Sequence, residues 1–293
     1  MTTTADSAAN LLSARVTVRY PGKAPVLDDV SLQIAPGEVL GLVGQSGSGK
    51  STLALAILGL LGRKRATVEG TILFQGSDLL SMPERNLRSL RGRSLSLVLQ
   101  SPLSSLNPAL RVRTQLKEAW RAHADTGTDC DAAIQSAMTS VSLPFDPPFL
   151  RKYPSQLSVG QAQRVLIAMA VMHRPALLIA DEATSALDVI TQSEILDLFA
   201  HLNREFSMSI LYISHDLPSV AGICQRIAIL NEGQIVECGP TAQIFAAPTH
   251  PYTQRLMASL PQLPARSEAP SAKAQAAVAA TASIRSNSHC VPR

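Results

Sequence analysis

The sequence predicts an α/β protein in which a mostly parallel sheet carries helices on both faces. Two observations lead to this fold class. First, apolar segments of strand length alternate with segments of helical character through much of the chain, and this alternation is typical of parallel sheets with helical crossovers. Second, a glycine-rich turn stands between an apolar strand and a helix. An antiparallel β subdomain is expected before this core, and a helical subdomain is expected as an insertion within it.

The N-terminal subdomain is predicted from residues 11–34, where apolar and polar positions alternate. Pro21 and Gly22 interrupt the alternation, which indicates antiparallel strands joined by a turn. Further strands are expected at 38–44, 95–99, 176–181 and 209–214, with a strand pair at 68–74 and a hairpin at 226–237. Helices are expected at 50–61, 79–90, 158–173 and 191–206.

The character of the chain changes after Gln100. Residues 101–157 show no clear strand pattern and have the character of helices broken by loops. We interpret them as a helical insert within one domain that spans 11–264. Residues 265–293 are rich in alanine and serine with little periodicity, a composition that predicts a disordered tail.

Composition excludes several classes of protein. Of 293 residues, 46% are apolar, which allows a sizeable core and argues against global disorder. A net charge of +4 is too small to favour a nucleic-acid binder, and the basic cluster 63–65 is interpreted as solvated surface. Four cysteines without C-x-x-C spacing support neither a zinc site nor a redox pair. No apolar run is long enough to cross a bilayer, so any service to a membrane is expected from outside the lipid.

The strongest motif is G-x-x-x-x-G-K-S, which begins at Gly44 and ends at Ser51. Glycines let the backbone curl so that its N–H groups point at an anion, and the helix that follows adds the positive end of its dipole. Lys50 is expected to reach the β- and γ-phosphates of ATP, and the Ser51 hydroxyl to ligate Mg²⁺. The residues predicted to hold ATP in this loop are Gly44, Gln45, Ser46, Gly47, Ser48, Gly49, Lys50, Ser51 and Thr52.

A second motif is an apolar strand, 177–180, that ends in Asp181 and Glu182. Because ligands of parallel sheets lie at the carboxyl ends of strands, these carboxylates are expected to face the phosphates. Asp181 is predicted to hold Mg²⁺, directly or through water, and Glu182 to polarise the attacking water. Together with the phosphate loop, the pattern is that of a P-loop NTPase core.

A third motif points to a family. Residues 157–161 read L-S-V-G-Q and stand just before a helix, and they resemble the L-S-G-G-Q signature of ABC ATPases. The other elements of that family follow in order, with Gln100 similar to the Q-loop glutamine, Ser185 to Asp188 similar to the D-loop, and His215 similar to the switch histidine. Tyr20 is similar to the aromatic residue that stacks on adenine. The resemblance covers residues 11–262.

The resemblance implies roles for these residues and a need for a partner. Gln100 is expected to touch Mg²⁺ or the attacking water, and His215 to contact the γ-phosphate and order Glu182. Ser158 and Gly160 are expected to contact the γ-phosphate of ATP held by an opposite subunit. The same shared site includes Gln161 and Asp188. One chain alone is therefore not expected to complete an active site.

Val159 departs from the family pattern, which usually has glycine there. A β-branched residue disfavours φ > 0. If this backbone must approach a phosphate closely, the site built on this signature would be weakened, and the pair of ATPases would be asymmetric.

Two stretches resemble the ATPases of peptide and nickel importers: Gln100 to Pro108, and His250 to Pro261 within a C-terminal segment at 240–264. The resemblance implies an ATP hydrolase on the cytoplasmic face of the inner membrane. Its implied partners are a second ABC ATPase, which forms a homodimer or a heterodimer with this chain, two membrane permeases and, indirectly, a solute-binding protein. The alternatives are an exporter ATPase and a non-transport ABC ATPase. Cys290 alone in the tail does not support a metal cluster there.

Overall fold

The computed structural model describes residues 10–62, 66–124 and 129–259. The basic cluster at 63–65, the predicted tail at 265–293 and Cys290 lie outside these ranges. The described part falls almost wholly within one compact unit, which extends to Met257. The strands are β1 (Leu12–Arg19), β2 (Pro25–Ile34), β3 (Val39–Val43), β4 (Thr67–Phe74), β5 (Ser77–Asp78), β6 (Leu95–Val98), β7 (Leu177–Asp181), β8 (Ser209–Ser214), β9 (Arg226–Asn231) and β10 (Gln234–Pro240).

The helices lie between these strands in the order that an α/β fold requires. They are α1 (Lys50–Ile57), α2 (Glu84–Leu90), α3 (Pro102–Ser105), α4 (Val112–Arg121), α5 (Cys130–Ser140), α6 (Pro147–Leu150), α7 (Val159–Val171), α8 (Val189–Phe206), α9 (Leu217–Ile223), α10 (Thr241–Ala246) and α11 (Pro251–Ala258), with a 3₁₀ turn at Pro154–Gln156. Every helix in the described ranges is too short or too polar to span a bilayer.

The central sheet has the strand order β10-β9-β3-β8-β7-β6. Strands β9, β3, β8, β7 and β6 run parallel, and β10 pairs with β9 in the antiparallel sense. Every residue of β3 is buried, which is typical of a parallel strand that is covered on both faces. The predicted mostly parallel sheet is therefore confirmed.

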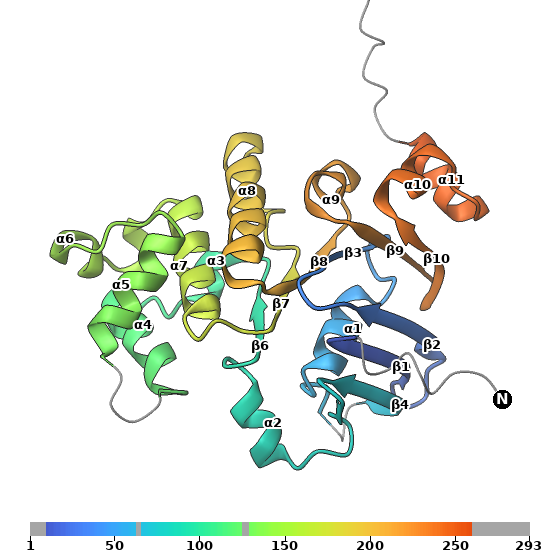
Figure 1. Cartoon of the computed structure of the whole chain (residues 1–293), viewed down its shortest axis with the longest axis horizontal. Helices are drawn as coiled ribbons and strands as arrows, with labels where there is room; N and C mark the ends of the chain where they lie inside the picture. The colour runs from blue at the N-terminus through green and yellow to red at the C-terminus, as the bar shows by residue number, and fades with distance from the viewer. Residues whose placement is uncertain (1–9, 63–65, 125–128, 260–293) are drawn as a thin grey trace, which may run out of the picture. The chain divides into compact units, whose positions relative to one another are not determined.

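Helices α1 and α9 cover opposite faces of this sheet (Figure 1). Leu40 and Leu42 of β3 belong to the same buried apolar cluster as Leu53 of α1. Gly41, between them, faces α9, and a Cβ added there would lie 2.5 Å from Val220. Because alternate residues of a strand point to opposite faces, these contacts place one helix on each side.

A second sheet, of order β2-β1-β4-β5, is antiparallel throughout. Buried positions alternate with more exposed ones along β1, so one face of the sheet packs into the core. Residues 68–74 were predicted to be a strand pair, but they belong to one strand, β4, which is followed by the two-residue strand β5. Seven residues are too few for two strands and the turn between them.

Helices α3 to α7 cluster beside β6 (Figure 1). Of these, α3 to α6 lie within 101–157, the segment interpreted as a helical insert, and α7 is the helix that was predicted separately at 158–173. Two predicted helices are shorter than expected. The helix at 50–61 ends at Ile57, since Gly59 turns to φ 62°, and the helix at 79–90 begins only at Glu84. Pro83 precedes it, and proline disfavours helical backbone in the residue before it.

Candidate nucleotide site

The glycine-rich segment between β3 and α1 forms the predicted phosphate loop. Gly47 and Gly49 adopt φ values of 82° and 109°, which glycine reaches without steric cost. Gly49 is the N-cap of α1, and no side chain caps this helix. The first N–H groups of α1 are therefore left without a side-chain acceptor, as an anion-binding helix start requires.

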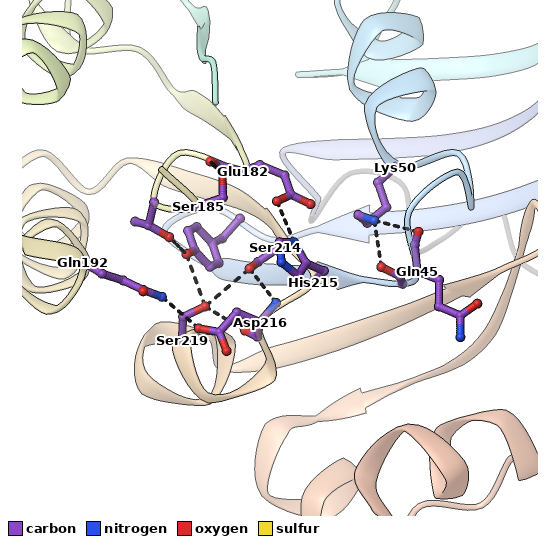
Figure 2. Close-up of polar contacts among 12 residues, drawn as sticks. Gln45, Lys50, Glu182, Ser185, Gln192, Ser214, His215, Asp216 and Ser219 are labelled. Atoms are coloured by element: carbon purple, nitrogen blue, oxygen red, sulfur yellow. Dashed lines mark hydrogen bonds and ion pairs between the residues drawn. The ribbon is translucent and has the colours of Figure 1, made fainter. Parts of the chain in front are cut away.

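Lys50 folds back over the loop that precedes it. Its Nζ donates hydrogen bonds to the backbone oxygens of Gly44 at 2.7 Å and Gln45 at 2.9 Å (Figure 2). Only 6% of Lys50 is exposed, and this burial lowers the pKa of its ammonium, while the nearby carboxylates of Glu182 and Asp181 oppose that shift. A phosphate bound in the loop would offset the cost of burying this positive charge.

Glu182 and His215 meet beside the loop. His215 Nδ1 lies 2.7 Å from Glu182 Oε2 (Figure 2). Glu182 directly follows β7 and has a left-handed φ of 52°, which is uncommon for a residue with a Cβ and is often found at functional sites. Its N–H donates to the backbone oxygen of Ile213 in β8 at 2.9 Å. The neighbouring strand thus holds the carboxylate toward the histidine.

A hydroxyl network supports the turn that carries His215. The buried Tyr212 hydroxyl donates to Ser219 Oγ at 3.3 Å, and the N–H of Asp216 donates to Ser214 Oγ at 3.0 Å. The two serine hydroxyls lie 3.5 Å apart (Figure 2). His215 is therefore placed by a turn whose two flanking residues are fixed by hydrogen bonds.

Asp181 and Ser51 provide a donor set that fits Mg²⁺. Oδ1 of Asp181 is buried and, among the described residues, has no hydrogen-bond partner. Burial raises the pKa of this carboxyl, while a hydrogen bond with the Ser51 hydroxyl lowers it. A buried, unpartnered carboxylate oxygen beside a hydroxyl suits a hard cation. Gln100, the third predicted ligand, is exposed and lines the adjoining cavity.

These elements surround a cavity of about 600 Å³. It brings together the phosphate loop, the carboxyl end of β7 and the residue that follows β8, as expected for the ligand site of a parallel sheet. The cavity is lined by Val26, Gly44, Gln45, Ser46, Gly47, Gly49, Lys50, Ser51, Thr52, Gln100, Glu182, His215 and Leu256. The predicted loop residue Ser48 is buried behind this lining, and its hydroxyl has no partner in the described chain.

Besides Ser48 and Asp181, five predicted site residues are absent from the cavity lining: Tyr20, Ser158, Gly160, Gln161 and Asp188. Tyr20 is half-buried and packs against the apolar core. Asp188 accepts hydrogen bonds from the backbone and side chain of Thr191 and caps α8, and these bonds lower the pKa of its carboxyl.

Ser158, Val159 and Gln161 form the first turn of α7. Ser158 Oγ accepts from the Gln161 N–H at 3.1 Å, and Gln161 Oε1 accepts from the Ser158 N–H at 3.2 Å, which is a capping box. Val159 is the first helical residue and has no positive φ. The strain expected for a β-branched residue at φ > 0 therefore does not arise. Asymmetry of the ATPase pair stays a prediction, but strain in the backbone of Val159 no longer supports it.

Two residues that the sequence did not single out also line the cavity, Val26 and Leu256. Leu256 lies in α11, more than 200 positions from the loop. It falls in the C-terminal stretch that had been noted only for its resemblance to importer ATPases. No local pattern could have placed it at the nucleotide site.

Two family models match segments of this chain. A family model described as ABC transporter matches residues 27–185. A second, described as the C-terminal region of oligopeptide/dipeptide transporters, matches residues 236–289.

Similar proteins share most of the chain. The oligopeptide transport ATP-binding protein OppD of Escherichia coli is 40% identical over 90% of this chain and 79% of its own length. The dipeptide transport ATP-binding protein DppD of Haemophilus influenzae is 44% identical over 83% and 74%.

Two solved structures share the fold. CbiO1 from Clostridium perfringens, part of an ABC transporter complex, aligns with a TM-score of 0.72 at 25% identity over 82% of this chain and 92% of its own. A dimeric ATP-binding cassette in a post-hydrolysis state with ADP and Pi aligns with a TM-score of 0.68 at 26% identity, over 78% and 98%. The chain therefore belongs to the ABC transporter family as an ATP-hydrolysing subunit that carries the C-terminal region of oligopeptide/dipeptide transporters.

Proposed function

We propose that this subunit binds MgATP in the cavity beside Lys50 and hydrolyses it to energise the import of oligopeptides or dipeptides across the inner membrane. The observation that carries this proposal is the meeting of the phosphate loop with the Glu182–His215 pair in one cavity. The names of the relatives favour peptides as the solute. Nickel, the other solute expected from the sequence, has no such support.

The residues of the cavity divide the work of hydrolysis. The loop N–H groups and Lys50 bind and orient the triphosphate. Glu182 accepts a hydrogen bond from the attacking water and polarises it, and His215, 2.7 Å away, holds that carboxylate in place. Ser51 and Asp181, with Gln100 nearby, would hold Mg²⁺, which neutralises charge on the phosphates when bound.

The exposed apolar face beside Asp188 favours a second ATPase as a partner of this chain. Val189 and Ile190 begin α8 and are 82% and 74% exposed, and Ser158 lies in the exposed first turn of α7. Helices α7 and α8 approach each other closely at Gly160, because a Cβ added there would lie 2.8 Å from the Thr191 methyl. A sister subunit would cover these apolar side chains and receive the Ser158 helix start.

The permease is expected to bind beside Gln100, on the cytoplasmic face of the membrane. Leu99 and Leu103 flank this glutamine and are 44% and 45% exposed. A groove of about 320 Å³, lined by residues of β6, α4 and α7, includes Leu99. A partner in this groove would contact Leu99, the residue next to Gln100. The solute-binding protein would act through the permease and not through this chain.

The test is the substitution Glu182→Gln in the transporter assembled with its permeases. Steady-state phosphate release should fall by about 10²- to 10⁴-fold, the usual contribution of a general base, while ATP binding is retained. Glu205→Gln is the matched control, because Glu205 lies near the end of α8 and pairs with His201 at 3.1 Å. Undiminished turnover in Glu182→Gln would remove Glu182 as the water-polarising base.

The direction of transport needs its own measurement, since an exporter shares the core motifs. Cells that carry the Glu182→Gln variant should lose uptake of a radiolabelled tripeptide. Retained uptake with lost efflux would favour the exporter.

A further inference from the structure

The C-terminal helix α11 contacts the phosphate loop directly. The N–H of Gln45 donates a hydrogen bond to the Tyr252 hydroxyl at 3.3 Å, across 207 positions of sequence. Tyr252 is only 6% exposed, so this hydroxyl is held between α11 and the loop. One turn further along α11, Leu256 lines the cavity.

Tyr252 and Lys50 bond to the same peptide group, the one between Gly44 and Gln45. Lys50 Nζ donates hydrogen bonds to the carbonyl oxygens of Gly44 and Gln45. The Lys50 ammonium has three N–H donors, so two of them hold carbonyl oxygens of the loop while a third is left for a phosphate. The Tyr252 hydroxyl is the side-chain contact that holds the N–H of Gln45 at the entrance of the loop.

Helix α11 is anchored on the sheet that carries the loop. Glu237 of β10 accepts hydrogen bonds from the Thr249 N–H at 2.8 Å, the Thr249 hydroxyl at 2.9 Å and the His250 N–H at 3.0 Å. Burial would raise the pKa of Glu237, but its hydrogen bonds with the segment Thr249–Thr253 lower it to about 2. The carboxylate therefore stays ionised at neutral pH and secures the turn just before α11.

The apolar part of the cavity lining favours the nucleoside end of a ligand. Among the described residues that line it, Val26 and Leu256 carry aliphatic side chains, and the others are glycines or polar. Charged phosphates gain nothing from aliphatic contact, whereas a base or ribose buries apolar surface against it.

We propose that α11 is part of the nucleotide site, with Tyr252 as a positioning residue for the phosphate loop and Leu256 as a wall against the nucleoside of ATP. This inference rests on the proposed function, because it assigns further contacts to the same site.

The experiment compares ATP with inorganic tripolyphosphate, which lacks the nucleoside, as ligands of the full-length chain. Both are titrated as competitors of a fluorescent ATP analogue. Tyr252→Phe keeps the ring and removes the hydroxyl, so it should weaken both ligands by about two- to tenfold, the range for one lost hydrogen bond. Leu256→Ala should weaken ATP by a similar factor and leave tripolyphosphate unchanged. Tyr153→Phe is the matched control, since its hydroxyl accepts from Arg111 in the helical insert at 3.4 Å.

A steady-state measurement in the assembled transporter separates positioning from general damage. Tyr252→Phe should raise the KM for ATP and leave kcat close to wild type, whereas a proportionate fall in kcat would overturn the positioning role. Unchanged affinity in Tyr252→Phe, or equal weakening of both ligands in Leu256→Ala, would likewise overturn the assignment of that residue. If Lys50→Ala lost ATP binding while both α11 variants kept it, the proposed function would stand and this inference would fall.

Discussion

Helices α1 and α7 differ in how the backbone N–H groups of their first turns are satisfied: α1 has no side-chain cap, whereas α7 has one. Helix α1 begins after Gly49, which offers no side-chain cap, and the loop before it opens into the cavity. Helix α7 begins after Ser158, which closes a capping box with Gln161 and lies outside the cavity lining.

The difference shows which phosphate contact the chain completes by itself. An uncapped helix start is free for an anion, and at α1 it meets Lys50, Glu182 and His215. At α7, Ser158 Oγ already accepts a backbone hydrogen bond, but its hydroxyl hydrogen is still available to donate. Because Ser158 is not part of this cavity lining, we expect that donor to serve a ligand held by another subunit.

The largest effect is expected at α1. Lys50→Ala should weaken ATP binding to the isolated chain by about 10- to 100-fold, because it removes charge-assisted hydrogen bonds to phosphate. Isothermal titration measures this directly. Lys117→Ala is the control, since that ammonium lies on the surface 3.6 Å from Asp131. Equal losses in both variants would mean that overall charge, and not the loop, holds the nucleotide.

A smaller and different effect is expected at α7. Ser158→Ala should leave ATP binding to the isolated chain unchanged and lower the ATPase rate of the assembled transporter by about tenfold, because one phosphate hydrogen bond is lost in the shared site. Loss of the cap should also lower Tm by about 2–4 °C, for about 1 kcal/mol in a domain of this size.

Asp146→Ala removes a comparable cap, that of α6, where the carboxylate accepts from the Phe149 N–H at 2.8 Å. It should lower Tm similarly and leave the ATPase rate intact. If Ser158→Ala weakened ATP binding to the isolated chain, the distinction between the two helix starts would fail.

The smallest effect is expected at Val159. This residue is 38% exposed and has ordinary helical backbone, so only its side-chain bulk can hinder a neighbouring phosphate. Val159→Gly should raise the ATPase rate of the assembled transporter by at most about twofold, since the gain in space is opposed by the cost of glycine in a helix. A rate identical to wild type would count against any asymmetry caused by Val159.

Local patterns predicted much of this site. The glycine spacing before Lys50, the acids after β7 and the histidine after β8 each depend on a strand followed by a turn, which neighbouring residues specify. The strand at 209–214 lies where the sequence predicted it. The later start of the helix predicted at 79–90 also has a local cause. Pro83 disfavours helical backbone in the residue before it, and this effect could have been predicted from the sequence.

Contacts between distant segments could not be read in the same way. The sequence did not predict α9 or α10, which are short and contain few periodic positions. It also did not place Val26, Tyr252 or Leu256 at the phosphate loop. Their side chains are of common types, and whether they lie near the phosphate loop depends on the order of the strands around β3.

The sequence by itself determined the chemistry of this protein: a backbone cradle for phosphate, a lysine to bind it, a carboxylate for the water and a serine-capped helix. Only the tertiary structure decided which of these groups share a cavity. The pairing of β3 with β8 and β9, together with that of β8 with β7 and of β9 with β10, brings Glu182, His215 and α11 to the loop. The start of α7 stays outside the cavity lining. The physical reason is that strand order follows from burying apolar faces across the whole sheet, a requirement that no single segment expresses.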